Sequence, residues 1–236
     1  MELRGGANRE QAFAVASSGA ACAADAAEDL VASGGAARGA EEVLALRLCA
    51  LTGEFYRANA ESFSQTRQSP WQGWVRLLEV VGLAAKQKPL RVLDLACGNL
   101  RFERYLADAL PGRMLSGWAV DNCDPLVEAG ERNESDALSR MSFQNLDAIE
   151  RLFAGCLREA LEAPDASCDL AVSFGFMHHV PLERWRVGLL RALIAKVRPG
   201  GFVAVSFWRF LNSDKLARKA KETTIRARAE LGIPEL

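Results

Sequence analysis

Several features that would indicate a membrane, a metal or a secreted protein are missing from this sequence. No apolar run approaches the roughly 20 residues of a membrane-spanning helix. The formal net charge of −1 gives no indication of a nucleic-acid or membrane partner. The two histidines are adjacent, and no two of the six cysteines have C-x-x-C spacing, which argues against a zinc site and a disulfide framework. We therefore expect free buried thiols, no bound metal and a reducing, cytoplasmic location.

The chain divides into three parts by composition. Residues 1–38 are rich in Ala, Gly and Ser, and we expect a low-complexity, flexible N-terminal segment. Residues 41–88 have helical spacing of apolar side chains, interrupted at Pro70, and are expected to form an N-terminal helical cap. From residue 89 to residue 236 short apolar strands alternate with helical segments, which indicates a separate ligand-binding domain.

This alternation predicts an α/β fold. Strands are expected at 90–96, 113–121, 141–147, 168–176 and 200–208. Helices are expected at 101–110, 124–133, 148–163 and 182–197. Such βαβ units form a Rossmann-like, mostly parallel sheet with helices on both faces, and ligands bind beyond the carboxyl ends of its strands.

The segment "RVLDLACGNLRFERYL" has the strand, turn and helix of a nucleotide-binding unit. A dinucleotide-binding turn carries G-x-G-x-x-G, in which the third glycine lets helix and strand pack closely beside the pyrophosphate. Here Ala96 and Arg101 stand at the first and third positions, and only Gly98 is present. The turn therefore predicts a ligand that approaches the bare backbone of Gly98 but carries no pyrophosphate.

Acidic residues lie at or near the ends of three successive predicted strands. Asp121 follows Gly98 by 23 residues, close to the usual interval of about 20 to a ribose-binding acid. Asp147 can accept a hydrogen bond from an adenine amino group, and Asp94 can face a ligand ammonium. A strand-terminal aspartate can also be no more than a helix N-cap. Ribose, adenine and ammonium groups without a phosphate together predict S-adenosylmethionine (SAM) as the ligand.

The same motifs resemble those of the class I SAM-dependent methyltransferases. "VLDLACGN" is similar to their first motif, "WAVDNCDPLV" and "FQNLD" to their second- and third-strand acids, and "CDLAVSFGFMHHVP" and "RPGGFVAVSFW" to strands four and five. The resemblance covers residues from about 54 to 210. The commoner first motif has glycine where Leu100 stands, so this side chain is expected to narrow the pocket. The cofactor contacts that the resemblance implies are Tyr56, Asp94, Ala96, Gly98, Asp121, Asn122, Asp147 and Phe174.

Sheets of this class normally have two more strands after the helix that follows strand five. No strand pattern follows "SFW", so the chain is expected to lack these strands or to be C-terminally incomplete. Strand five would then have an open edge, where a partner subunit could bind.

The stretch "FYRANAESFSQTRQSPWQGW" and the later "HH" resemble the tRNA wobble-uridine (carboxymethyl-uridine) methyltransferases, which esterify a carboxymethyl group. The resemblance implies Arg67 and His178 as catalytic residues, and Ser64, Trp71 and His179 as substrate-binding residues. It also implies a carboxylate acceptor, on tRNA or on a small molecule. Such an acceptor is already ionised at neutral pH and needs no general base.

Several alternatives remain open. The chain could bind SAM as a scaffold without turnover, whereas a dinucleotide enzyme is disfavoured by Arg101. Each histidine could cap a helix or pack in a loop. Arg67 could hold the acceptor carboxylate or the cofactor's own carboxylate by a bidentate pair, or it could be a solvated surface residue. The tail "KLARKAKETTIRAR", with six basic residues and one acidic residue, could attract a phosphate backbone or form only a solvated helix face.

Overall fold

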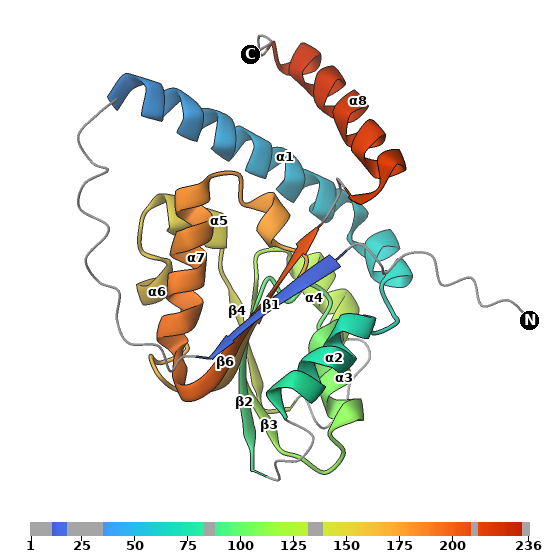
Figure 1. Ribbon diagram of the computed structural model, residues 1–236, viewed down its shortest axis with the longest axis vertical. Helices are drawn as coiled ribbons and strands as arrows, with labels where there is room; N and C mark the ends of the chain where they lie inside the picture. The colour runs from blue at the N-terminus through green and yellow to red at the C-terminus, as the bar shows by residue number, and fades with distance from the viewer. Residues whose placement is uncertain (1–10, 18–34, 83–87, 132–138, 209–211, 233–236) are drawn as a thin grey trace, which may run out of the picture.

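The computed structural model describes residues 11–17, 35–82, 88–131, 139–208 and 212–232 (Figure 1). These residues form one six-stranded sheet with the strand order β1-β6-β5-β2-β3-β4. Strands β2 to β6 run parallel, and β1 runs antiparallel to β6, which confirms the predicted α/β, mostly parallel sheet. The strands are β1 (Gln11–Ser17), β2 (Leu90–Leu95), β3 (Leu115–Asp121), β4 (Met141–Asn145), β5 (Cys168–Ser173) and β6 (Val197–Trp208).

Helices cover both faces of the sheet. Side chains of β2 alternate between the faces: Leu93 and Leu95 pack in a core with α5, α6 and α7, whereas Leu90 and Val92 pack with α2 and α3. The helices are α1 (Gly35–Thr66), α2 (Gln72–Val81), α3 (Arg101–Ala109), α4 (Asp124–Glu131), α5 (Ala148–Phe153), α6 (Leu157–Ala160), α7 (Glu183–Lys196) and α8 (Asp214–Leu231), and a 3-10 turn spans Met177–His179. No helix within the described residues is both long and apolar enough to cross a membrane.

The single helix predicted over 148–163 is instead two short helices, α5 and α6. Gly155 lies between them with φ of 70°, and its amide donates to the Leu152 carbonyl at 3.1 Å. Glycine adopts this left-handed conformation at little cost, so the helix ends there although the apolar pattern continues.

The edge of β6 is covered by the N-terminal strand β1 (Figure 1). Their register runs from Gln11 opposite Trp208 to Ser17 opposite Phe202. The expectation of an open edge at β6 is therefore wrong, because β1 pairs with the backbone groups that were expected to be free. The binding of a partner subunit stays a prediction. Within the segment 1–38, which is expected to be flexible, residues 11–17 form β1 and α1 begins at Gly35. Residues 1–10 and 18–34 of that segment lie outside the described residues.

Deleting residues 1–17 should expose the edge of β6. We expect a melting temperature lower by roughly 5 °C or more, together with association that increases with protein concentration. A deletion of residues 1–10 leaves β1 in the chain and serves as the matched control, which should behave as the full chain does. Calorimetry and size-exclusion chromatography at two concentrations measure both effects. A monomeric 1–17 deletion with an unchanged melting temperature would show that β1 does not protect this edge.

Candidate functional site

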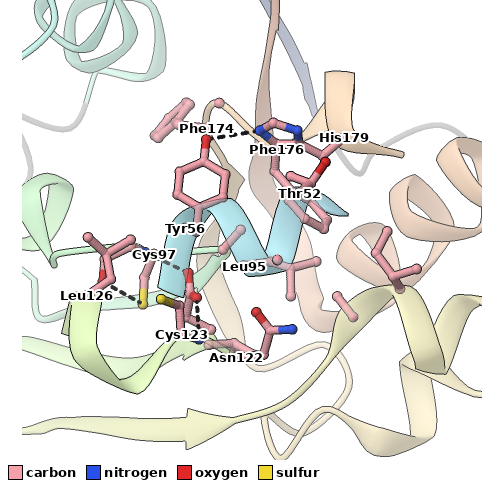
Figure 2. Close-up of a pocket in the computed structure, with 18 of the residues that line it drawn as sticks. Thr52, Tyr56, Leu95, Cys97, Asn122, Cys123, Leu126, Phe174, Phe176 and His179 are labelled. Atoms are coloured by element: carbon pink, nitrogen blue, oxygen red, sulfur yellow. Dashed lines mark hydrogen bonds between the residues drawn. The ribbon is translucent and has the colours of Figure 1, made fainter. Parts of the chain in front are cut away.

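A cavity of about 720 Å³ lies between α1 and the carboxyl ends of β2, β3 and β5 (Figure 2). Its volume is in the range of small-molecule sites, about 300–1,000 Å³. The structure brings to it every site residue predicted from the sequence except Ser64: Tyr56, Arg67, Trp71, Asp94, Ala96, Gly98, Asp121, Asn122, Asp147, Phe174, His178 and His179.

The turn after β2 forms the floor of this cavity and has an unusual backbone. Ala96, Gly98 and Leu100 have φ values of 65°, 58° and 56°, in the left-handed region. For a residue other than glycine this conformation costs about 1–2 kcal/mol. Ala96 and Leu100 therefore adopt a backbone conformation that is typical of glycine and is unfavourable for residues with a side chain. The Leu100 side chain is buried in a cluster with Cys97, Ala119 and Val127 and does not line the cavity. The expectation that Leu100 narrows the pocket is therefore wrong.

Asp121, at the end of β3, ties this turn to the neighbouring strand. Its Oδ2 accepts the Gly98 N–H at 2.9 Å, and its Oδ1 accepts the Cys123 N–H at 2.9 Å. Burial raises the pKa of Asp121, and the Gly98 amide partly offsets this. Each carboxylate oxygen keeps a lone pair, so both can still accept hydrogen bonds from a ligand.

Asp147 has two partners inside the protein. As the N-cap of α5 it accepts the Glu150 N–H at 3.0 Å through Oδ1, and its Oδ2 accepts from Asn122 Nδ2 at 2.8 Å. The N-cap that the sequence left open is thus present, and the same carboxylate also lines the cavity.

A second carboxyl group lies beside Asp94, beneath the turn. Asp94 and Glu103 are each only 2 % exposed. Asp94 Oδ1 and both oxygens of Glu103 lack hydrogen-bond donors among the described residues. Burial raises the pKa of Glu103 to about 7, and burial followed by the charge of Glu103 raises the pKa of Asp94. The sequence analysis missed Glu103, although an acid in the first turn of α3 is a visible signal.

Residues 67–71 form a strip between α1 and α2, and Asn99 holds this strip against the turn after β2. Sequence reasoning missed Asn99. The Asn99 Nδ2 donates to Ser64 Oγ at 3.0 Å and to the Arg67 carbonyl at 3.3 Å. Ser64 is 4 % exposed and does not reach the cavity, so its hydroxyl anchors the strip. Trp71 lies over Gly175, where a Cβ atom would come within 3.3 Å of the indole.

His178 and His179 line another part of the cavity wall. His179 Nε2 is 3.1 Å from the Tyr56 hydroxyl, which links the wall to α1 (Figure 2). The His178 and His179 ring centroids are 3.9 Å apart, and the Trp208 ring is 4.9 Å from His178. Burial lowers the pKa of His179 to about 4, and burial followed by the charge of His179 lowers that of His178 to about 3. Both imidazoles are therefore neutral at pH 7. Within the described residues no group of His, Cys, Asp and Glu side chains is arranged to hold a metal ion.

Comparison with known families identifies the domain. A family model described as a methyltransferase domain matches residues 65–231, which is more than half of the chain. The chain belongs to this family. It is a class I SAM-dependent methyltransferase domain, and its cofactor is SAM.

Individual relatives of this methyltransferase are more distant. It is 29 % identical over 159 residues to the mouse tRNA (carboxymethyluridine(34)-5-O)-methyltransferase ALKBH8. The aligned region covers 66 % of this chain and 19 % of that protein. It is 28 % identical over 149 residues to trans-aconitate 2-methyltransferase of Mycobacterium tuberculosis, which covers 61 % of this chain and 44 % of that one. The chain thus spans less than half the length of both. A SAM-dependent methyltransferase structure from Aquifex aeolicus superposes with a TM-score of 0.43 at 17 % identity, over 61 % of this chain and 71 % of that chain.

The cavity of the methyltransferase fits SAM on its own chemistry. Asp94 lies on the floor of the cavity, and its ionised form suits an ammonium group. The free lone pairs of Asp121 suit ribose hydroxyls, and the left-handed backbone at Gly98 leaves the floor without a side chain. These residues, with Asp147 farther along the wall, are those that would hold the cofactor.

Replacing Asp121 with alanine should weaken SAM binding by at least about 100-fold. Charge-assisted hydrogen bonds contribute roughly 1.5–3 kcal/mol each, and the ribose would lose two. Because Gly98 and Cys123 also lose their acceptor, the variant should be less stable too, and Asp121→Asn helps to separate the two effects. Asp108→Ala, at an exposed position on α3, is the control. Calorimetric titration with SAM is the measurement, and a folded Asp121→Ala protein with wild-type affinity would exclude the ribose contact.

Replacing Glu103 with glutamine should reduce the pH dependence of stability, while Asp94, whose pKa is also raised by burial, keeps part of it. Because the folded pKa of Glu103 is raised to about 7, the folded protein holds this proton more tightly than the unfolded chain, and stability falls as pH rises from about 4.5 to about 7. At pH 8 we expect Glu103→Gln to unfold with a free energy higher by on the order of 3 kcal/mol, and to match wild type near pH 4.5.

Urea unfolding at several pH values tests this. Glu61→Gln, which removes an exposed carboxylate on α1, is the control and should leave the profile unchanged. A Glu103→Gln protein with the wild-type slope would show that this carboxyl group does not hold a proton in the folded state.

Proposed function

We propose that the protein methylates a carboxylate oxygen, and that this carboxylate is the carboxymethyl group of a tRNA wobble uridine. The observation that carries the proposal is Arg67. Its guanidinium lines the cavity 4.6 Å above the Phe63 ring, and no described carboxylate forms an ion pair with it. A guanidinium in this position suits a carboxylate, which it can hold by a bidentate pair of hydrogen bonds.

The chemistry of the cavity also favours an acceptor that needs no proton removed. SAM supplies an electrophilic methyl group: the acceptor oxygen forms the new C–O bond as the S–CH3 bond breaks, and sulfur keeps the electron pair. The pKa values of His178 and His179, near 3 and 4, make them poor bases for an ammonium acceptor. A carboxylate is already ionised at pH 7, so the protein has only to desolvate and align it.

The named relatives support the same acceptor group. The names of ALKBH8 and of trans-aconitate 2-methyltransferase both specify a compound that carries a carboxyl group. The first relative favours tRNA. The second, together with a cavity of about 720 Å³, favours a small carboxylic acid as the second candidate.

Transfer of labelled methyl from SAM to tRNA with and without the carboxymethyl group tests the proposal. We expect label only in the carboxymethylated tRNA, sensitive to salt because phosphates are contacted, and a loss of at least about 100-fold in kcat/KM for Arg67→Gln. Arg191→Gln, at an exposed position on α7, is the control.

Transfer to trans-aconitate but to neither tRNA would favour the second candidate. Efficient transfer to an amine or a phenol alone would overturn the carboxylate assignment. SAM binding without transfer to any acceptor would indicate a protein that binds SAM without turnover.

A further inference from the structure

Arg101 is the first residue of α3 and lines the same cavity as Arg67. Its guanidinium lies 4.9 Å above the Trp71 ring and 5.2 Å from the Trp74 ring, and one N–H donates to the Ser69 carbonyl at 3.2 Å. Two indole rings thus hold the guanidinium in place. This arrangement limits the side chain to a few conformations and leaves most of its donors available.

The two arginines are held near each other by the same turn. Asn99 precedes Arg101 by two residues and binds the Arg67 carbonyl at 3.3 Å, so the backbone of one arginine is fixed relative to the other. Burial, followed by the charges of Arg67 and Arg104, lowers the pKa of Arg101 to about 10, and the group remains charged at pH 7. Repulsion between the guanidinium groups of Arg67 and Arg101 raises the free energy of the protein when no ligand is bound.

No carboxylate among the described residues offsets this repulsion, because none forms an ion pair with Arg67 or with Arg101. Two partly buried cations without a counter-charge, both facing one cavity, are typical of a site for a ligand with more than one negative group.

We propose that Arg67 and Arg101 form a two-point anion site, and that the acceptor carries a second negative group, a carboxylate or a phosphate, beside the carboxylate that is methylated. This inference rests on the proposed function, in which Arg67 holds the reacting carboxylate. Arg101 then binds the second group and determines specificity. The ester has one negative charge fewer than the acceptor, so the product is bound less tightly than the substrate.

Two pairs of probes test the site on protein loaded with S-adenosylhomocysteine. Trans-aconitate carries three carboxylates and crotonate one; 5-carboxymethyluridine 3′-phosphate carries a phosphate that 5-carboxymethyluridine lacks. We expect titration calorimetry to show at least tenfold tighter binding of the multiply charged member in one of the two pairs. The pair that discriminates identifies the source of the second charge, a free polycarboxylate or a nucleotide.

Arg101→Gln should abolish that discrimination, Arg101→Lys should restore part of it, and Arg191→Gln should leave it unchanged. The affinity for S-adenosylhomocysteine should stay within twofold in all three. Equal binding within both pairs, or Arg101→Gln protein that loses affinity for S-adenosylhomocysteine itself, would overturn the inference.

The inference and the proposed function can fail separately. If a carboxylate is methylated and Arg101→Gln leaves its KM unchanged, the two-point site is wrong while the proposed function stands. If doubly charged probes bind through Arg101 but no carboxylate is methylated, the anion site stands and the proposed reaction does not.

Discussion

The hydrogen bond from the Gly98 amide to the Asp121 carboxylate fixes the distance between the ends of β2 and β3. In the turn that contains this bond, the backbone is left-handed at Ala96, Gly98 and Leu100, and two of these residues are not glycine. The buried Asn99 side chain points from this turn toward the end of α1, where its amide donates to Ser64 and to the Arg67 carbonyl. A contact at the end of the sheet thus also helps to place the strip that contributes Arg67 and Trp71 to the cavity.

The other walls of the cavity come from elements outside the sheet. α1 packs on α4 through Ala60 and Leu126, and the Tyr56 hydroxyl reaches His179 on the opposite side. Because the histidines are buried and neutral, they exclude water and add little charge. The charged side chains that line the cavity therefore include the aspartates of the floor and the arginines Arg67 and Arg101.

Residues at strand ends could be predicted from the sequence, because parallel strands bring their carboxyl ends to one edge of a sheet. This reasoning placed Asp121 and Asp147 at the cavity. Ser64 is predicted as a substrate-binding residue but does not line the cavity, and Glu103 is not predicted at all. The position of Ser64 depends on the Asn99 amide, and that of Glu103 on which face of α3 is buried. From the sequence, Arg101 argues only against a pyrophosphate ligand, because its position over Trp71 depends on how α2 packs against α3. The strand β1 could not be predicted, since a short alanine-containing alternation resembles low-complexity sequence until its distant partner is known.

The pairing of β1 with β6 joins residues that lie about 190 positions apart in the chain. At ribosomal synthesis rates the first strand waits on the order of 10–40 s before the second emerges. The five parallel strands form around contacts of shorter sequence separation, so the sheet can grow from its centre while its N-terminal strand is still unpaired. Closure of this edge therefore waits until β6 has emerged, and the nascent chain is most exposed to pairing with its neighbours on the same messenger RNA just before β6 is complete.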